Sequence, residues 1–276
     1  PYWLVGAVLL TVWSGTAYGA YFYFVKHLQL WDASWIILVT TVTGFHAVFN
    51  RFVKEFSLKQ QIKKQFEHYL APAMVKKLQK DPSLLRLGGE TRTMTFMFSD
   101  IRGFTPISEK YKGNPEGLTK LINRFLTRMT DIIIKNGGTI DKFMGDCIMA
   151  FWNAPIDDGQ HEEHAVQAAL EMQEELKLLN AELTSEGLPN INIGIGINTG
   201  EALVGNMGSD QRFDYSVIGD AVNLASRLES SSKTLGKTLV VGEETVKAAK
   251  LNYNFDYVDE ITVKGKTEAI KVYTIS

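Results

Sequence analysis

The sequence has a single cysteine, Cys147, among its 276 residues. One cysteine excludes an internal disulfide framework and is typical of a reducing compartment. Cys147 lies in a predicted strand, where we expect it to pack as a small apolar side chain. The formal net charge is only −2, so the composition gives no reason to expect a nucleic-acid partner.

Charge is also absent from two stretches near the start, 2–25 and 33–50, which contain no Asp, Glu, Lys or Arg. At about 1.5 Å per helical residue, the first can cross a hydrocarbon core of about 30 Å and the second only just can. Trp and Tyr near their ends are typical of a membrane interface. The first stretch lacks the basic start and cleavage pattern of a signal peptide. We therefore predict a transmembrane helical hairpin over residues 1–50.

Basic residues predict the orientation of this hairpin. They follow it closely, at Arg51, Lys54, Lys59, Lys63 and Lys64. The positive-inside rule then places the rest of the chain in the cytoplasm, so we expect a multi-pass protein of the cell (inner) membrane. The chain begins with Pro1 rather than Met, and we expect further parts upstream.

Residues 51–90 are polar and helix-prone, and we predict a helical linker there. Apolar residues recur at spacings of four, three and four, at Ile62, Phe66, Tyr69 and Ala73. This spacing suits a short coiled-coil seam. A solvated amphipathic helix at the membrane surface explains it equally well, and both interpretations stay open.

The stretch 93–105 predicts a buried strand that ends in an acid. Asp100 stands where the strand should stop, Gly103 allows a close backbone approach, and Thr105 can cap a following helix. An acid beside a glycine turn suits a cation and a phosphate. The alternative is that Asp100 is a plain turn or cap residue.

A second acid stands in a predicted hairpin over 139–153, whose two strands meet at Gly145-Asp146. Gly-Asp favours a two-residue turn, so Asp146 alternatively serves the turn alone. Two carboxylates on neighbouring strands can bind divalent metal together, as in two-metal phosphoryl-transfer sites.

The remaining pattern mixes helices and strands. We predict helices over 118–134, 160–183, 220–230 and 243–249, with strands over 191–198, 199–207, 212–217 and 238–241 and a hairpin over 255–273. Alternate glycines in 191–198 indicate a close approach by another element. This order resembles a split βαβ, ferredoxin-like core of the α+β class. His161 and His164 are three residues apart, but no third metal ligand stands at a known spacing.

The short helix over 220–230, which Asp220 should cap, presents two polar residues on one face. Asn223 and Arg227 are four residues apart among apolar neighbours. Their burial would be costly without partners. Either Arg227 pairs with a local acid, Glu229 or Asp220, or both side chains point into a polar cleft.

Four segments together resemble the catalytic domain of the class III nucleotidyl cyclase family. They occur in the family's order: MFSDIRGFT at 97–105, DKFMGDCIMAFW at 141–152, FDYSVIGDAVNLASRLES at 213–230 and VKGK at 263–266. The resemblance implies a ferredoxin-like catalytic domain over 91–276. The N-terminal part resembles bacterial membrane-anchored adenylate cyclases that have an upstream extracytoplasmic sensor, such as a CHASE-type domain.

The resemblance implies a role for each matching residue. Asp100, Asp146 and the carbonyl of Ile101 would hold two divalent cations, Mg²⁺ or Mn²⁺. Asn223 would orient the ribose, and Arg227 would stabilise charge on the α-phosphate. Phosphate contacts would come from Gly103, Phe104, Thr105, Lys264 and Arg212.

Two positions imply the choice of base. In the family, Lys at the position of Lys142 goes with adenine and Glu with guanine, because adenine N1 accepts a hydrogen bond. Ser216 occupies the second position and can both accept from and donate to the base. The resemblance thus implies an adenylate cyclase that acts on ATP as a homodimer with sites at the interface. A guanylate cyclase and a catalytically inert regulatory module are the alternatives.

Overall fold

The computed structural model describes residues 2–30, 32–66, 87–209, 211–249, 253–262 and 269–275. The chain divides into two compact units, Pro1–Leu70 and Ala71–Ser276.

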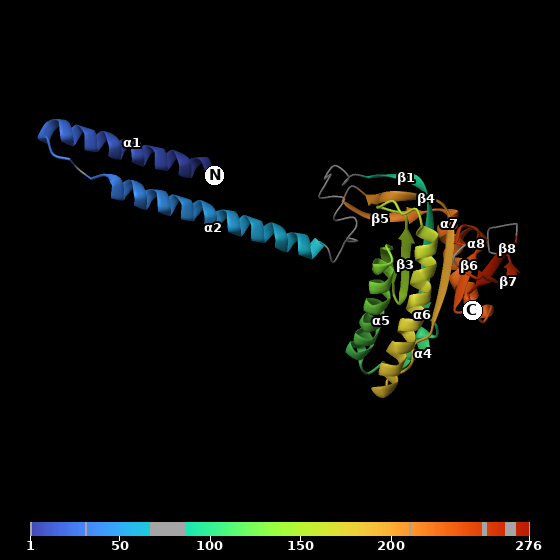
Figure 1. Ribbon diagram of the computed structural model, residues 1–276. Coiled ribbons are helices and arrows are strands. Elements are labelled where there is room, and N and C mark those ends of the chain that lie inside the picture. Colours follow the sequence, from blue (N-terminus) through green and yellow to red (C-terminus); the bar gives the residue numbers. More distant parts are fainter. Residues whose placement is uncertain are drawn as a thin grey trace. The chain divides into compact units, whose positions relative to one another are not determined.

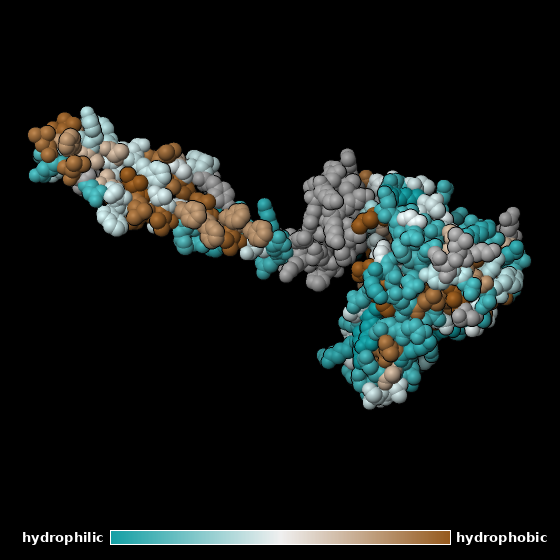
Figure 2. Space-filling model, in the orientation of Figure 1, coloured by the Kyte–Doolittle hydropathy of each residue, from teal (hydrophilic) through white to brown (hydrophobic). Residues whose placement is uncertain are grey.

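The first unit is a pair of helices, α1 (Tyr2–His27) and α2 (Ser34–Phe66). The indole N–H of Trp13 donates to Thr40 Oγ1 at 3.1 Å and ties the two together. Apolar side chains cover much of their exposed surface (Figure 2). By length and composition, Val5–His27 and Ser34–Gln61 could each cross a membrane.

The second helix continues well past residue 50, where we expected its membrane-spanning part to end. Residues 51–66, which we assigned to a separate linker, therefore prolong α2. Tyr69 and Ala73 of the predicted seam lie outside the described residues, so the seam stays a prediction.

The second unit is an α+β domain, as predicted (Figure 1). Its strands are β1 (Gly88–Ile101), β2 (Thr139–Met144), β3 (Cys147–Trp152), β4 (Ile193–Ser209), β5 (Arg212–Ile218), β6 (Leu239–Gly242), β7 (Asp256–Ile261) and β8 (Ile270–Thr274). Its helices are α4 (Phe104–Lys110), α5 (Pro115–Lys135), α6 (His161–Ser185), α7 (Asp220–Thr234) and α8 (Glu243–Ala249).

Within the described residues the strands form one sheet in the order β2-β3-β1-β4-β6-β8-β7, with β5 paired to β4. β4 corrects one expectation, because 193–209 is a single strand rather than two strands joined at a turn. The reason is its pairing with β1, which runs unbroken from Ile101↔Ile193 to Gly88↔Asn206. This ladder overrides the local turn signal around Thr199.

β1 is covered on both faces. Met97 and Ile101 belong to the core shared with α5 and α6, whereas Phe96 and Phe98 pack in the core that includes residues of α7. A strand that is buried on both sides needs apolar residues at consecutive positions rather than at alternate ones. This explains the apolar run that ends at Asp100.

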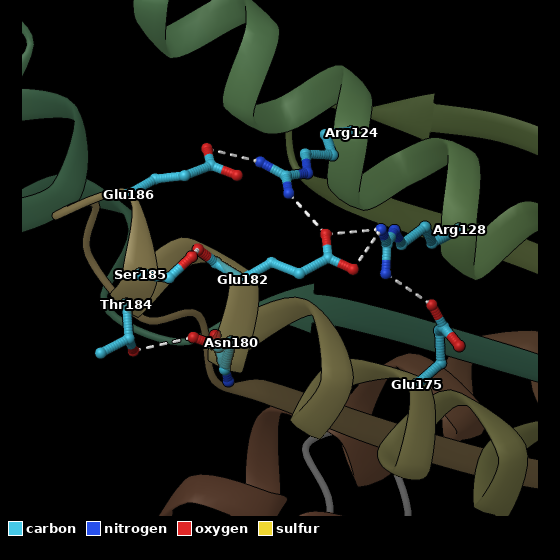
Figure 3. Close-up of polar contacts among 8 residues, drawn as sticks. All are labelled: Arg124, Arg128, Glu175, Asn180, Glu182, Thr184, Ser185 and Glu186. Carbon is cyan, nitrogen blue, oxygen red and sulfur yellow. Dashed lines mark hydrogen bonds and ion pairs between the residues drawn. The ribbon is translucent and has the colours of Figure 1, made fainter.

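An ion-pair network joins α5 to α6 (Figure 3). Arg124 bonds Glu182 and Glu186, and Arg128 bonds Glu182 and Glu175 at 2.7–2.8 Å. The hydrogen bonds from Arg128 and then Arg124 lower the pKa of Glu182. The attraction is therefore fully present above the ordinary pKa of a glutamate and is lost as pH falls through the lowered value.

α7 packs directly on the backbone of β4 because glycines leave room for it. A Cβ on Gly196 would lie 2.2 Å from the backbone nitrogen of Glu229 and 2.4 Å from the carbonyl oxygen of Ala225. A Cβ on Gly194 would meet the side chains of Glu229 and Ser232 at 2.6 Å. The expectation that another element approaches this strand closely is confirmed.

Gly196→Ala should therefore force α7 away from the sheet. We expect a loss of stability of about 1–3 kcal/mol or more, as is typical of overpacking. Gly113→Ala is the matched control, since nothing lies within 4 Å of a Cβ there. Thermal unfolding of the detergent-solubilised chain, followed by near-ultraviolet circular dichroism, measures both. Equal melting temperatures would contradict the described packing.

Candidate active site

Two carboxylates meet at one end of the sheet because β1 and β3 are antiparallel. Asp100 lies near the end of β1, and Asp146 lies in the tight turn just before β3. The pairing Ser99↔Ile148 brings the end of the one strand beside the start of the other. Gly145 makes the turn possible with φ of 70°, a left-handed conformation that suits glycine.

The two ionised carboxylates of this acid pair are unfavourable so close together. Burial, and then the charge of Asp146, raise the pKa of Asp100 to about 6. Asp146 Oδ2 is buried and has no hydrogen-bond partner among the described residues. A buried carboxylate oxygen without a partner is costly, and a bound cation would relieve that cost.

Glu229 of α7 is a third acid near this pair, which sequence reasoning did not place there. Burial and then Asp100 raise its pKa to about 7, while Arg102 opposes the shift. Ala225 and Glu229 are four residues apart and so share one face of α7. Because the glycines of β4 predict a close approach by another element, this shared face is the sequence signal that could have located Glu229. In the parts of the chain that the structure describes, no group of three or more His, Cys, Asp or Glu is arranged to hold a metal.

The turn after β1 is anchored to the far end of α7. Arg102 donates to Ser232 Oγ at 3.0 Å and to the carbonyl oxygen of Lys237. Gly103, with φ of 68°, is the N-cap of α4, which begins at Phe104. Thr105 therefore lies inside the helix, and the expectation that it caps the helix is wrong.

α7 also begins differently from our expectation. Its N-cap is Gly219 rather than Asp220, which is the first residue of the helix. An acid in the first turn still interacts favourably with the helix dipole.

The two base-recognition candidates come together around a third residue, Asp141. Ser216 Oγ of β5 donates to Asp141 Oδ2 at 2.7 Å, and Lys142 Nζ lies 3.3 Å from Asp141 Oδ1. The Asp141 side chain is fully buried, whereas that of Lys142 is 45% exposed. Burial raises the pKa of Asp141, against the opposing effects of Ser216 and Lys142.

Asn223 and Arg227 face away from this chain's own acid pair. Ala225 lies against β4, and two positions along a helix are about 200° apart, which turns Asn223 and Arg227 to the opposite side of α7. Neither side chain has a hydrogen-bond or ion-pair partner among the described residues. The expected alternative, a pair between Arg227 and Glu229 or Asp220, is not formed.

Of the remaining candidates that the structure describes, none is brought to the acid pair. Lys264 lies outside the described residues. Arg212 is exposed at the start of β5, where its backbone N–H bonds Ser209 Oγ. His161 Nδ1 lies 2.8 Å from Thr95 Oγ1, and His164 Nδ1 lies 2.8 Å from Asp158 Oδ2, so the two histidines serve separate contacts.

Cys147 is inert where it lies beside the acids. Burial and the neighbouring Asp100 raise the pKa of its thiol to about 12, so the thiolate is not formed near neutral pH. The expectation of a packing role agrees with this.

Residues 89–276 match the family described as the adenylate and guanylate cyclase catalytic domain. Because this match spans well over half of the chain, the protein belongs to that family. The resemblance seen in its four sequence segments is thereby confirmed.

Individual relatives give the same family. Adenylate cyclase of Anabaena cylindrica is 35% identical over 86% of this chain and 47% of its own length. Adenylate cyclase 1 of Rhizobium meliloti is 35% identical over 66% of this chain and 27% of its own length. The chain thus spans about half or less of these curated relatives.

Solved structures agree on the fold but differ in the nucleotide they are named for. The adenylyl cyclase CyaB from P. aeruginosa is 38% identical, with a TM-score of 0.64, and the match covers 69% of this chain and 96% of that one. The guanylyl cyclase Cya2 is 37% identical, with a TM-score of 0.63 over 68% of this chain and 94% of that one. Similarity alone therefore leaves the base open.

The acid pair predicts a pH-dependent stability. Without metal, Asp100 loses its proton near pH 6 in the folded state and near pH 3.9 in the unfolded state, so stability falls as pH rises through this window. Asp146→Asn removes the repulsion and should raise the melting temperature of metal-free protein at pH 7.5 but not at pH 4.

Mn²⁺ should stabilise the wild type and leave Asp146→Asn almost unchanged. Asp131→Asn, an exposed residue of α5, serves as the control. Thermal scans with and without a chelator provide the comparison. Equal Mn²⁺ stabilisation of the wild type and Asp146→Asn would show that the pair is not a cation site.

Proposed function

We propose that this protein is an adenylate cyclase that converts ATP to 3′,5′-cyclic AMP and pyrophosphate. The observation that carries the proposal is the acid pair, with the buried and unpartnered Asp146 Oδ2, in a chain of the cyclase family. Two carboxylates this close repel each other when both are ionised, and bound cations would offset that repulsion.

The residues present fit divalent cations. Asp100, Asp146 and the carbonyl of Ile101 would supply oxygen ligands, which Mg²⁺ and Mn²⁺ both prefer. Two bound cations would lower the pKa of the ribose 3′-hydroxyl and neutralise charge on the leaving pyrophosphate.

The reaction forms one P–O bond and breaks another. The 3′-oxygen attacks the α-phosphorus, its proton passes to solvent, and the bond from the α-phosphorus to the pyrophosphate oxygen breaks. Asn223 would hold the ribose in line, and Arg227 would stabilise the negative charge that builds on the α-phosphate. Contacts to the triphosphate would come from Gly103, Phe104, Thr105, Lys264 and Arg212.

Lys142 and Ser216 support ATP over GTP. A lysine donates to adenine N1, an acceptor, whereas guanine N1 carries a hydrogen and needs a carboxylate. A guanylate cyclase is the second candidate, since the guanylyl cyclase Cya2 is among the similar structures. An inert regulatory module is disfavoured because Asp100, Asp146 and Arg227 are all present in the sequence.

The acid pair and the polar residues Asn223 and Arg227 lie on opposite sides of α7, which supports a homodimer with two equivalent sites. Asp100 and Asp146 lie toward the sheet side of α7, and Asn223 and Arg227 lie on the other side, so a second copy would complete each site. Exposed apolar side chains also need a cover. They lie on β2, β4 and β5, at Phe143, Met144, Leu203 and Ile218.

The helical pair supports a membrane anchor. We propose that α1 and α2 form a multi-pass anchor in the cell membrane and that the basic residues after Asn50 keep the catalytic domain in the cytoplasm. An upstream sensor would then act through α2, which continues beyond the apolar span to Phe66.

Product formation tests the function directly. Purified protein is given ATP or GTP with Mg²⁺ or Mn²⁺, and the cyclic nucleotide is measured by chromatography. We expect cyclic AMP and pyrophosphate from the wild type and a loss of at least about 100-fold in Asp146→Ala. Cyclic GMP as the main product would mean that the second candidate is right, and no product from a verified dimer would favour the regulatory module.

Mixing two inactive variants tests the shared site. Asp146→Ala and Arg227→Ala should each be inactive as homodimers. In a heterodimer one site has both defects and the other has neither, so random pairing should restore about a quarter of wild-type activity. No recovery from a mixture shown to contain heterodimers would indicate that each chain builds its own site.

A further inference from the structure

We propose that Asp141 determines purine selection by fixing the direction of the Ser216 hydroxyl and the position of the Lys142 ammonium group. Asp141 is a positioning residue in this proposal, which rests on the proposed adenylate cyclase function. It acts through the two side chains that contact the base.

A β-bulge explains how Asp141 and Lys142 can act together. Neighbouring residues of a regular strand point to opposite faces of the sheet. The register of β2 with β3 shifts between Ile140 and Lys142, which leaves Asp141 as the extra residue. A bulge re-aims side chains, and here Lys142 Nζ comes within 3.3 Å of the carboxylate of its own neighbour.

The Asp141 carboxylate is held firmly enough to act as a fixed acceptor. Its side chain is fully buried, and its Oδ2 accepts from Ser216 Oγ at 2.7 Å. Its Oδ1 has no hydrogen-bond partner among the described residues and lies 3.3 Å from Lys142 Nζ in an ion pair. Ser216 itself is buried. An alternative position for the hydroxyl proton would leave the carboxylate of Asp141 short of a donor, which is costly in a buried site.

The fixed hydroxyl changes what Ser216 can offer to a base. Serine has one O–H donor, and when that proton is given to Asp141 only acceptor lone pairs remain. Adenine presents an N6 amino donor, whereas guanine presents an O6 acceptor in the same place. Ser216 would thus match adenine and repel guanine, rather than both donate and accept as its residue type alone allows.

Lys142 supplies the hydrogen-bond donor that complements the Ser216 acceptor. Its ammonium group has only donors, and it pairs with Asp141 Oδ1 at 3.3 Å while Asp141 Oδ2 accepts from Ser216. Lys142 would then donate to adenine N1 while Ser216 accepts from adenine N6. A site built to pair with polar groups rejects an analogue that leaves them unpaired, so the preference should be large.

Nucleotide binding without turnover tests this inference. The probes are 3′-deoxy-ATP and 3′-deoxy-GTP, which lack the attacking hydroxyl, and calorimetry with Mn²⁺ on the full chain in detergent gives both dissociation constants. We expect the wild type to prefer 3′-deoxy-ATP by more than about tenfold, or about 1.4 kcal/mol. Asp141→Asn, whose amide can donate to Ser216 and free its proton, should reduce this preference at least tenfold.

Several variants separate positioning from general damage. Asp131→Asn should leave the preference unchanged, and Ser216→Thr, which keeps the hydroxyl, should largely retain it. In the Ser216→Ala background, Asp141→Asn should change the preference much less than it does alone. If Asp141 had only a structural role, Asp141→Asn would weaken the binding of both nucleotides equally and leave the ratio of their dissociation constants unchanged.

Two results would overturn the inference. One is a ratio of the two dissociation constants that is unchanged in folded Asp141→Asn. The other is an unchanged ratio in Ser216→Ala, which decides the matter even if Asp141→Asn does not fold. Cyclic AMP formation by the wild type would leave the proposed function standing in either case, whereas a wild type that does not prefer 3′-deoxy-ATP would count against both.

Discussion

The close packing of α7 on the glycines of β4 is the constraint on which the rest of the candidate site depends. With no side chain at Gly194 and Gly196, the helix lies against the strand's backbone. This contact fixes the rotation of α7 about its axis. Glu229 is turned toward the acid pair, and Arg227 is turned away from it. The separation of the proposed metal-binding and charge-stabilising side chains within one chain is thus a consequence of backbone packing.

Strand pairing positions the acids and the proposed base-recognition residues in the same way. The antiparallel register of β1 with β3 brings Asp100 to Asp146, and the bulge in β2 brings Asp141 to Lys142 and Ser216. Both arrangements leave a polar group that is costly in the isolated fold: the unpartnered Asp146 Oδ2 and a fully buried Asp141 carboxylate. Stability is given up at the places where binding is proposed, as is common at functional sites.

Much of the fold could be predicted from the sequence, because local signals were consistent with the final structure. The Gly145-Asp146 hairpin, the long amphipathic helix α5 and the α+β order were all predictable from periodicity and turn chemistry. The unbroken β4 was not, since its continuity comes from pairing with β1 rather than from its own residues. The role of Asp141 was likewise hidden, because a bulge depends on the register between strands and leaves no mark in residue spacing.

In the proposed homodimer, one chain supplies the acids and its partner supplies Asn223 and Arg227 to the same nucleotide. A crystal structure of the full chain with 3′-deoxy-ATP and Mn²⁺ tests it most directly. We predict that each triphosphate contacts Asp100 and Asp146 of one protomer and Asn223 and Arg227 of the other. A nucleotide contacted by all four residues of a single chain would contradict it.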